Sequence, residues 1–461
     1  MPIFLNEKLP THSDAYGSVS HPSIRHEGAR RRKPKGQIFF LVSLCSVSIG
    51  LALWRHFPTV RQPIGGSSSS VSVKSADDPR LEWYQNPDDA KYCLEWEADA
   101  EKNLAFASLE LPVTASLLFF LSRGPVAGHI EIYRRPGRNQ PEALVNVTMQ
   151  YHASEDLSRT KVCRMGSGEE HGVLFWAEYS RALTQPAQDI RFQITVQLPA
   201  RGGWKEYKDL STDLPLFSHA LDDFTDIWGG AIFEVVRFKS SNAPIHHGGL
   251  AAHSAFIQTS NAQVQGLFLG MDAYSVQTSN ASIASEALLA ADEDSPNSGP
   301  RIDLRTSNGK INALLLLADN TVLSAEIHTT LAPLEITVYQ HNVYHAAQMT
   351  VLRLSASTSA ARAALHLDSG YEGTYELHTR SPGEASVEEK PDVEDPLGLG
   401  RLRMVTREPT ERGAHLRGSV FWSEAGEPGG MADRGFITVS TSVEHVELFL
   451  DESLEGSGGL E

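Results

Sequence analysis

The sequence predicts an all-β protein of stacked strand-turn-strand repeats, solenoid-like or as an elongated sandwich, with one N-terminal transmembrane helix. Three observations carry this prediction. Apolar and polar residues alternate through much of the chain after residue 81, a Thr-Ser-Asn motif recurs between the alternating runs, and one long apolar run follows a basic N-terminus. A period of two is the spacing of a half-buried strand, and a recurring turn motif indicates a repeat architecture.

The composition is that of a folded protein with an acidic surface. The 461 residues are 41% hydrophobic and 21% charged, and the formal net charge is −17. A chain of this length has room for two or three domains. Binding to nucleic acid requires a basic footprint, so we expect no nucleic-acid partner.

A membrane anchor is predicted over residues 37–54. The run IFFLVSLCSVSIGLALW has no charge and no proline, and as a helix it would span roughly 26 Å of a bilayer core of about 30 Å. The basic stretch RRRKPKG precedes it, so the positive-inside rule makes residues 1–36 a disordered cytoplasmic tail. A cleaved signal peptide and a buried core helix are the alternatives, and the long polar tail disfavours both.

The rest of the chain is then expected in the secretory pathway or at the cell surface. Residues 55–80 are rich in Ser, Pro and Gly and predict a flexible stalk. Cys93 and Cys163 would face an oxidising compartment, where they form a disulfide or stay as two buried thiols. The sequons at Asn146 and Asn280 would permit glycosylation there.

Residues 81–250 predict a β-rich N-terminal part of the ectodomain. Its strand-like runs lie at 116–121, 128–134, 143–151, 172–179 and 190–199. In the last run Phe192, Ile194 and Val196 share one face. Short helical turns are expected at 216–228 and 343–349.

Residues 251–452 predict an adhesin-like β-repeat part. The stretch 381–418 is rich in Pro, Gly and charge, which favours an extruded loop. Residues 453–461 form a polar tail.

The recurring motif predicts a structural corner between two strands. It reads Thr259-Ser260-Asn261, Thr278-Ser279-Asn280 and Thr306-Ser307-Asn308-Gly309, with looser copies starting at Thr329 and Thr441. Five residues after the first Thr, every copy has an apolar residue: Val264, Ile283, Ile311, Leu334 and Val446. Asn and Gly tolerate positive φ, and Ser and Asn side chains bond nearby backbone, so a tight turn is expected here.

An alternating run precedes the motif. In one copy Tyr274, Val276 and Thr278 would face inward, and in another Ile302, Leu304 and Thr306. One unit cannot bury its apolar face alone, whereas stacked units can, with their turns in register along one edge. An ordinary β-sandwich with similar hairpins is the alternative. The 112-residue interval before the last copy leaves open whether the units form one stack or two domains.

These repeats resemble a known family. The successive TSN(G/A)xI units, after the strand RFQITVQLP, resemble the putative adhesin domain of bacterial surface proteins and, more closely, its fungal membrane-anchored relatives. The segments 367–379 and 435–450 also resemble those fungal proteins. The resemblance implies an all-β repeat fold on a membrane-tethered or secreted protein, and it brings no catalytic residues.

No catalytic, cofactor or metal site is predicted. The sequence has no G-x-S-x-G elbow, P-loop or dinucleotide fingerprint. Candidate ligand sets without the spacing of a metal motif are His341 with His345; His246 and His247 with His253; and Asp292 and Asp294 with Asn297. The alternating acids Glu95, Glu97 and Asp99 are expected at a solvated strand edge. The tryptophans are scattered and expected mostly in the core: Trp83, Trp96, Trp176, Trp204, Trp228 and Trp422.

The leading functional hypothesis is a non-enzymatic, membrane-anchored, adhesin-like protein that binds a glycan or a protein. A carbohydrate-active enzyme on a β-helix is the first alternative, and it would need carboxylates clustered on adjacent coils. Asp303 is the only acid inside the three closest repeat strands, which disfavours that alternative. A purely structural membrane protein is the second.

Overall fold

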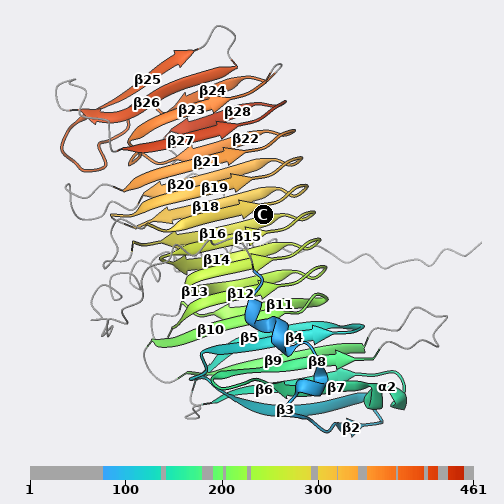
Figure 1. Cartoon of the computed structure of the whole chain (residues 1–461). Coiled ribbons are helices and arrows are strands. Elements are labelled where there is room, and N and C mark those ends of the chain that lie inside the picture. Colours follow the sequence, from blue (N-terminus) through green and yellow to red (C-terminus); the bar gives the residue numbers. More distant parts are fainter. Residues whose placement is uncertain are drawn as a thin grey trace, which may run out of the picture.

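Two facing β-sheets, here named sheet A and sheet B, form the body of the protein (Figure 1). The computed structural model describes residues 76–136, 142–178, 190–200, 204–225, 230–291, 299–318, 320–340, 350–380, 383–409, 414–423 and 434–450. Within these ranges the chain is all-β, and its short helical turns are η1 (Pro79–Tyr84), η2 (Pro87–Asp89) and α2 (Ser154–Arg159).

The order of strands in space differs from their order in the chain. Sheet A holds β1 (Tyr92–Cys93), β7 (Thr160–Met165), β8 (Glu170–Ala177), β4 (Leu117–Arg123), β10 (Lys205–Asp213), β12 (Ala231–Lys239), β13 (Ile245–Gln258), β15 (Ala273–Gln277), β17 (Arg301–Arg305), β19 (Val322–His328), β21 (Val351–Ser357), β27 (Gly435–Ser440), β23 (Gly373–His378), β26 (His415–Ser423) and β25 (Leu402–Pro409). Sheet B holds β2 (Glu97–Asp99), β3 (Leu104–Pro112), β6 (Glu142–Gln150), β9 (Ile190–Ala200), β5 (Val126–Pro136), β11 (Phe217–Asp223), the first half of β13, β14 (Val264–Gly270), β16 (Ile283–Leu289), β18 (Ile311–Leu317), β20 (Leu334–Gln340), β22 (Ala363–Leu367), β28 (Val446–Leu450) and β24 (Ala385–Glu389).

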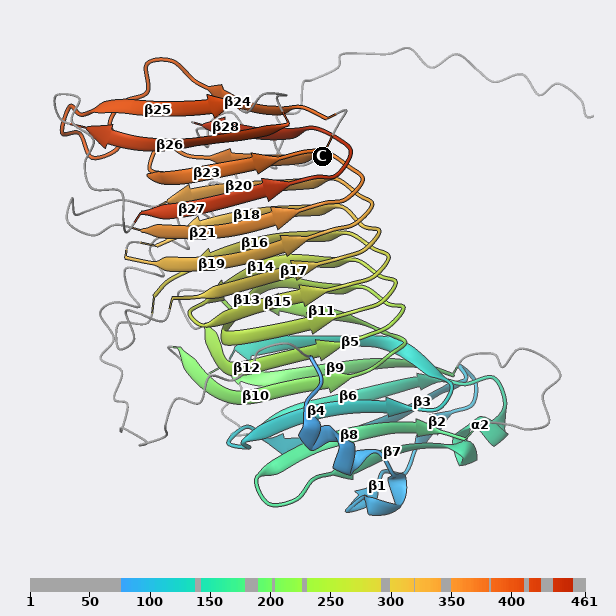
Figure 2. The same cartoon turned by 45° about the horizontal axis from the view of Figure 1, so that its top comes forward.

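The chain winds as a flattened coil, which confirms the predicted stack of repeats. From β10 to β24, each strand of sheet A leads through a turn to a strand of sheet B, and the chain then returns to sheet A one level further along (Figure 2). β15 pairs in parallel with β13 and β17, and β16 pairs in parallel with β14 and β18. Strands joined by a Thr-Ser-Asn turn therefore lie in opposite sheets, and the alternative of similar hairpins is wrong.

The core fills the space between the two sheets. The residues predicted to face inward from the repeats are buried: Tyr274, Val276, Ile302 and Leu304. The apolar residues five positions after the motif stack in one column, since Val264 lies beside Ile283, and Ile283 beside Ile311. Truncation of such a buried side chain to alanine costs about 2–5 kcal/mol, so this column explains why the spacing recurs.

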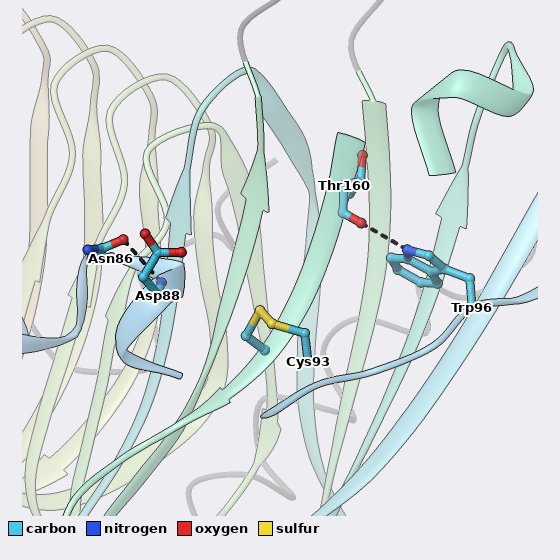
Figure 3. The surroundings of a disulfide bond; sticks show 6 residues. Asn86, Asp88, Cys93, Trp96 and Thr160 are labelled. Carbon is cyan, nitrogen blue, oxygen red and sulfur yellow. Dashed lines mark hydrogen bonds between the residues drawn. A yellow bond between two sulfur atoms is a disulfide. The ribbon is translucent and has the colours of Figure 1, made fainter. Parts of the chain in front are cut away.

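Antiparallel strands close the N-terminal end of the stack. β1 and β7 extend sheet A, and β2, β3 and β6 extend sheet B. The structure joins the two candidate cysteines, Cys93 on β1 and Cys163 on β7, in a disulfide (Figure 3). Closing a loop with a sequence separation of 70 residues stabilises the fold by about 4 kcal/mol in the chain-entropy model. Nearby, the Trp96 indole donates a hydrogen bond to the backbone carbonyl of Thr160.

The predicted stalk ends earlier than residue 80. Ala76 is buried with Phe256 and Ala273, and Arg80 pairs with both Asp78 and Asp209. Residues 76–80 are thus docked on sheet A, because a small apolar residue and an ion pair anchor them there. Residues 55–75 lie outside the described part.

One further sequence prediction is wrong. The helical turn expected at 216–228 is strand β11, whose residues Phe217, His219 and Leu221 alternate inward. The division between the two predicted parts at residue 250 falls inside β13, which belongs to both sheets and makes the stack continuous. The other predicted helical turn, 343–349, lies outside the described residues.

The stretch 381–418 is also not simply an extruded loop, because its described residues include β24, β25 and the start of β26. These strands lie at the C-terminal end of the stack, where one face is exposed, and Val387, Val405 and Leu416 are partly buried against the core. Charged residues between them hide the period of two.

The two strands that flank the last copy of the motif, β27 and β28, each lie between two other strands and not at the end of a sheet. β27 lies between β21 and β23, and β28 lies between β22 and β24. The 112-residue interval is therefore an insertion in the sequence of one stack, and the described repeats do not divide into two domains.

Among the described residues, no helix is long and apolar enough to cross a bilayer. The tail 1–36, the predicted span 37–54 and the polar tail 453–461 lie outside these residues. The transmembrane helix stays a prediction.

Candidate functional site

The Thr-Ser-Asn turns lie one above another along one edge of the stack, here named the corner edge (Figure 2). The threonine of each motif is buried, and its hydroxyl donates to a backbone carbonyl of the preceding corner. Thr306 Oγ1 lies 3.1 Å from the carbonyl oxygen of Ala281, and Thr329 Oγ1 lies 3.0 Å from that of Gly309. Threonine suits this position because its methyl group packs in the core while its hydroxyl satisfies a backbone acceptor.

The asparagines of the motif form a ladder of amide groups. Asn261 donates through Nδ2 to Oδ1 of Asn242, Asn280 to Asn261, and Asn308 to Asn280, each over 2.6 Å. At the next corner the equivalent position is Leu331, whose backbone N–H bonds to Ser307 as that of Asn308 bonds to Ser279. The ladder ends there, because the later copies of the motif have no asparagine at this position.

Two corners of the same geometry escaped the sequence search. Ser240-Ser241-Asn242 precedes Ile245, and Thr358-Ser359 precedes Ala363, each with the same interval of five residues. Ser240 is buried and donates to the carbonyl oxygen of Phe217, and Thr358 donates to that of Ala332. One copy has serine in place of the threonine, and the other has alanine in place of the larger apolar residue. These substitutions hid the motif, although its five-residue interval is present in both copies.

Gly309 occupies its corner for a different reason from the one expected. No residue of the described turn 306–310 has a positive φ, so left-handed backbone is not what selects Asn-Gly here. A Cβ on Gly309 would lie 1.8 Å from the carbonyl oxygen of Ala281. Glycine is needed because successive corners approach closely. The Thr-Ser-Asn residues are thus structural groups of the fold.

Acids on the outer face of the repeats pair with neighbouring cations. Arg305 on β17 contacts Asp303 on the same strand and Glu326 on β19. Lys310 likewise contacts Glu335 over 2.6 Å on the sheet B side. Asp303 therefore takes part in an ion-pair network and does not meet a second acid in a groove.

A pocket of about 450 Å³ opens on the outer face of sheet B, near the N-terminal end of the parallel stack. Its lining includes Glu131 and Tyr133 from β5 and Ala220 and Asp222 from β11. β5 and β11 run side by side, with Ala220 directly opposite Glu131. The small side chain of Ala220 leaves the space that the longer side chains surround.

The chemistry of this pocket suits a polar ligand with an apolar face. Tyr133 is half-buried, while Glu131 and Asp222 are exposed. The aromatic ring offers a stacking surface, and the two carboxylates offer acceptors for hydroxyl groups. The sequence search missed these residues, because Glu131 and Asp222 lie on strands that only the fold brings together.

The histidines at 246, 247 and 253, all within strand β13, do not gather. His246 is exposed, His253 lies 3.9 Å from Asp272, and His247 points into the core. There the Nδ1 atom of His247 lies 2.9 Å from the carbonyl oxygen of Leu267, to which it donates. Burial lowers the pKa of His247 to about 4, against the effect of that hydrogen bond.

The other predicted sets also stay apart where the structure describes them. Glu95 and Glu97 are exposed at β2, and Asp99 pairs with Lys102 over 2.8 Å. His341, His345, Asp292, Asp294 and Asn297 lie outside the described residues. Within the described ranges, a group able to hold a metal ion consists of Glu376, His378 and His415.

The sequons occupy contrasting places. Asn146 lies in β6, with its Oδ1 accepting a hydrogen bond from Ser108. Asn280 is a rung of the amide ladder. The tryptophans remain scattered, with Trp83 exposed at 79% and Trp422 buried; Trp228 lies outside the described residues.

Comparison with known proteins gives weak similarities. No protein-family model matches the chain, and no curated protein matches it in sequence. Among solved structures, it is similar to a putative cell adhesion protein from Clostridium sporogenes ATCC 15579, at 6% identity and a TM-score of 0.15, covering 75% of this chain and 98% of that chain. It is also similar to a putative adhesin from Bacteroides fragilis NCTC 9343, at 8% identity and a TM-score of 0.24, covering 74% of this chain and 96% of that chain. At these TM-scores neither similarity carries an argument about function, which depends instead on the geometry of the chain.

Proposed function

We propose that the protein is a non-enzymatic, adhesin-like binding protein whose ligand is a carbohydrate. The observation that carries the proposal is the outer-face pocket in which Glu131, Tyr133 and Asp222 meet. Sugars present apolar C–H faces and a rim of hydroxyl groups, which match a pocket lined by an aromatic ring and two carboxylates. The alternative is that the ligand is a protein, and the test below distinguishes the two.

The architecture supports presentation of this pocket away from a membrane. Parallel pairing makes the described stack one continuous body, and its corner edge is closed by hydrogen bonds between coils. A pocket built on β-strands keeps its geometry better than one built on loops. The predicted span at 37–54 would anchor this body, with the N-terminus cytoplasmic.

A glycan-binding screen of the purified full-length chain tests the proposal. We expect binding to a defined set of glycans and a loss of roughly tenfold in affinity for Tyr133→Ala, equivalent to about 1.4 kcal/mol. Glu326→Gln is the matched control, because Glu326 is an acid on the outer face of sheet A. No glycan binding, or equal loss in the control, would contradict the proposal.

A carbohydrate-active enzyme is the second candidate, since the pocket holds two carboxylates, Glu131 and Asp222. Glycoside hydrolases use such a pair as acid and base or nucleophile. The bound glycan should therefore be incubated with the wild type and with Glu131→Gln. Release of reducing ends by the wild type alone favours the enzyme, and an unchanged glycan favours the binding protein.

The proposed topology has its own test. A reporter fused after residue 461 should be protected from the cytosol, and glycosidase should shift the mass of the chain if Asn146 is modified. A cytosolic reporter would overturn the orientation and would leave the binding proposal standing, because the two depend on different residues.

A further inference from the structure

A cluster of two histidines and one glutamate lies far from the pocket, on the outer face of sheet A at the C-terminal end of the stack. His378 on β23 lies directly opposite His415 on β26 in an antiparallel pair. Their rings stack with centroids 4.1 Å apart and planes within 15°. Glu376 lies two residues before His378 on the same face, since side chains alternate along a strand.

The ligand atoms of the three side chains lie within 4.8 Å of one another. Glu376 Oε1 lies 3.0 Å from Nε2 of His415 and 3.2 Å from Nε2 of His378. Bonds of about 2.0–2.1 Å in a tetrahedral zinc site separate neighbouring ligand atoms by about 3.3 Å. The two separations from the carboxylate oxygen are therefore close to those of a zinc-ligand set, and the stacked imidazoles would turn so that both nitrogen lone pairs face the ion.

The guanidinium group of Arg417 lies beside these atoms. Arg417 Nε lies 2.7 Å from Oε1 of Glu376 and 3.1 Å from Nε2 of His415. One imidazole nitrogen cannot accept from the guanidinium and donate to the carboxylate at the same time. A metal ion would satisfy the nitrogen and the carboxylate together. The Arg417 side chain is 60% exposed, so it can turn into solvent when a metal enters.

We infer that Glu376, His378 and His415 form a binding site for a divalent transition metal, with Zn²⁺ as the best-fitting ion. Two imidazoles and one carboxylate are a donor set that zinc accepts, and a fourth position stays open to water. The metal would connect β23 to β26, where the parallel stack changes to an antiparallel hairpin. It would thereby stabilise the C-terminal end of the stack.

Metal titration of the full-length, untagged and chelator-treated chain tests this inference. Isothermal titration calorimetry should show one Zn²⁺ per chain, and Zn²⁺ should raise the melting temperature while Mg²⁺ does not. Co²⁺ in place of Zn²⁺ should give the visible absorption of a tetrahedral site. His378→Ala and His415→Ala should each weaken Zn²⁺ binding by roughly tenfold or more, at least as much as the loss of a supporting outer-shell group.

Two controls keep the result decisive. His328→Ala removes a histidine from the outer face of β19, where it contacts Ser357, and it should leave Zn²⁺ binding unchanged. Arg417→Gln removes the competing guanidinium and should bind Zn²⁺ as tightly as the wild type or more tightly. The inference is overturned if Arg417→Gln, folded by circular dichroism, binds no Zn²⁺, or if both histidine variants keep wild-type affinity.

Discussion

The two long edges of the stack are built on opposite rules. From β12 to β22, and again between β27 and β28, every connection at the corner edge has five residues: 240–244, 259–263, 278–282, 306–310, 329–333, 358–362 and 441–445. Nearer the ends of the stack, the corner-edge connections 214–216 and 379–384 have three and six residues. At the other edge, here named the loop edge, connections vary from the two residues at 271–272 to the twelve at 390–401. Both edges join the same two sheets.

The difference teaches where the sequence carries architectural information. Each corner bonds to the corner before it, through Thr hydroxyls, backbone N–H groups and asparagine amides. A change of length in one corner would break contacts with two others. Connections at the loop edge do not share one length, so the chain can vary there without moving the strands.

The largest expected effect comes from changing the length of one corner. A glycine inserted between Asn308 and Gly309 should destabilise the protein by on the order of 3–5 kcal/mol, because it shifts the register of β18 against β16. The same insertion after Ala291, at the loop edge, should cost little. Urea unfolding of both variants measures the contrast, and equal losses would abolish the distinction between the edges.

Acid should weaken the stack in the sheet B half of β13, between the two edges. His247 is buried there, and the Ser285 hydroxyl donates to Tyr274, whose hydroxyl lies 3.5 Å from Nε2 of His247. Burial lowers the pKa of His247 to about 4, below the ordinary value of about 6.5. The unfolded chain therefore takes up a proton between these values while the folded chain does not, and stability falls as the pH falls.

The loss attributable to His247 should reach about 2 kcal/mol between pH 6.5 and pH 5. His247→Gln should show a correspondingly flatter dependence of urea stability on pH in this window. Above pH 7 the two proteins should change in parallel. Identical slopes below pH 6.5 would show that His247 titrates normally in the folded state.

The cost of adding a single methyl group should show how closely successive corners stack. Gly309→Ala places a Cβ against the backbone of the corner below and should cost about 1–3 kcal/mol. Gly248→Ala, inside the sheet B half of β13, is the control, because the nearest atom to its Cβ would be at an ordinary distance of 3.4 Å. Thermal melts compare the two, and an equal effect would argue against close stacking of the corners.

The smallest expected effect is the loss of one rung of the amide ladder. Asn280→Ala removes a donor to Asn261 and an acceptor from Asn308, and because the amides are exposed it should cost about 1 kcal/mol. Asn312→Ala, on the outer face of β18 away from the corners, serves as the control. Equal melting temperatures for the two variants would mean that the ladder adds no stability.

The periodic part of the fold could be predicted from the sequence, whereas the strands at the C-terminal end of the stack could not. Tyr274 and Val276 could be placed in the core because alternation is local, and the corners because their spacing repeats. Strands β24 to β26 were missed, since an exposed face allows charges such as Glu388 that erase the apolar pattern. A strand at the end of a stack resembles a loop in composition.

The candidate sites could not be found from the sequence, because each depends on register between distant strands. Glu376 and His415 lie 39 residues apart, and only the pairing of β23 with β26 brings them together. The pocket likewise needs β5 beside β11. No motif spacing links these residues, so the expectation of no metal ligands followed from the absence of a local pattern.

The position of β27 between β21 and β23 constrains how the chain can fold. Most coils can be added in the order in which they are synthesised, each on the one before. The coil formed by β23 and β24 cannot be added in this way, because the level beneath it is supplied by β27 and β28, residues 435–450. Until residues 435–450 have been synthesised, β23 lacks its parallel partner β27, so the coil that contains β23 cannot pack on the stack.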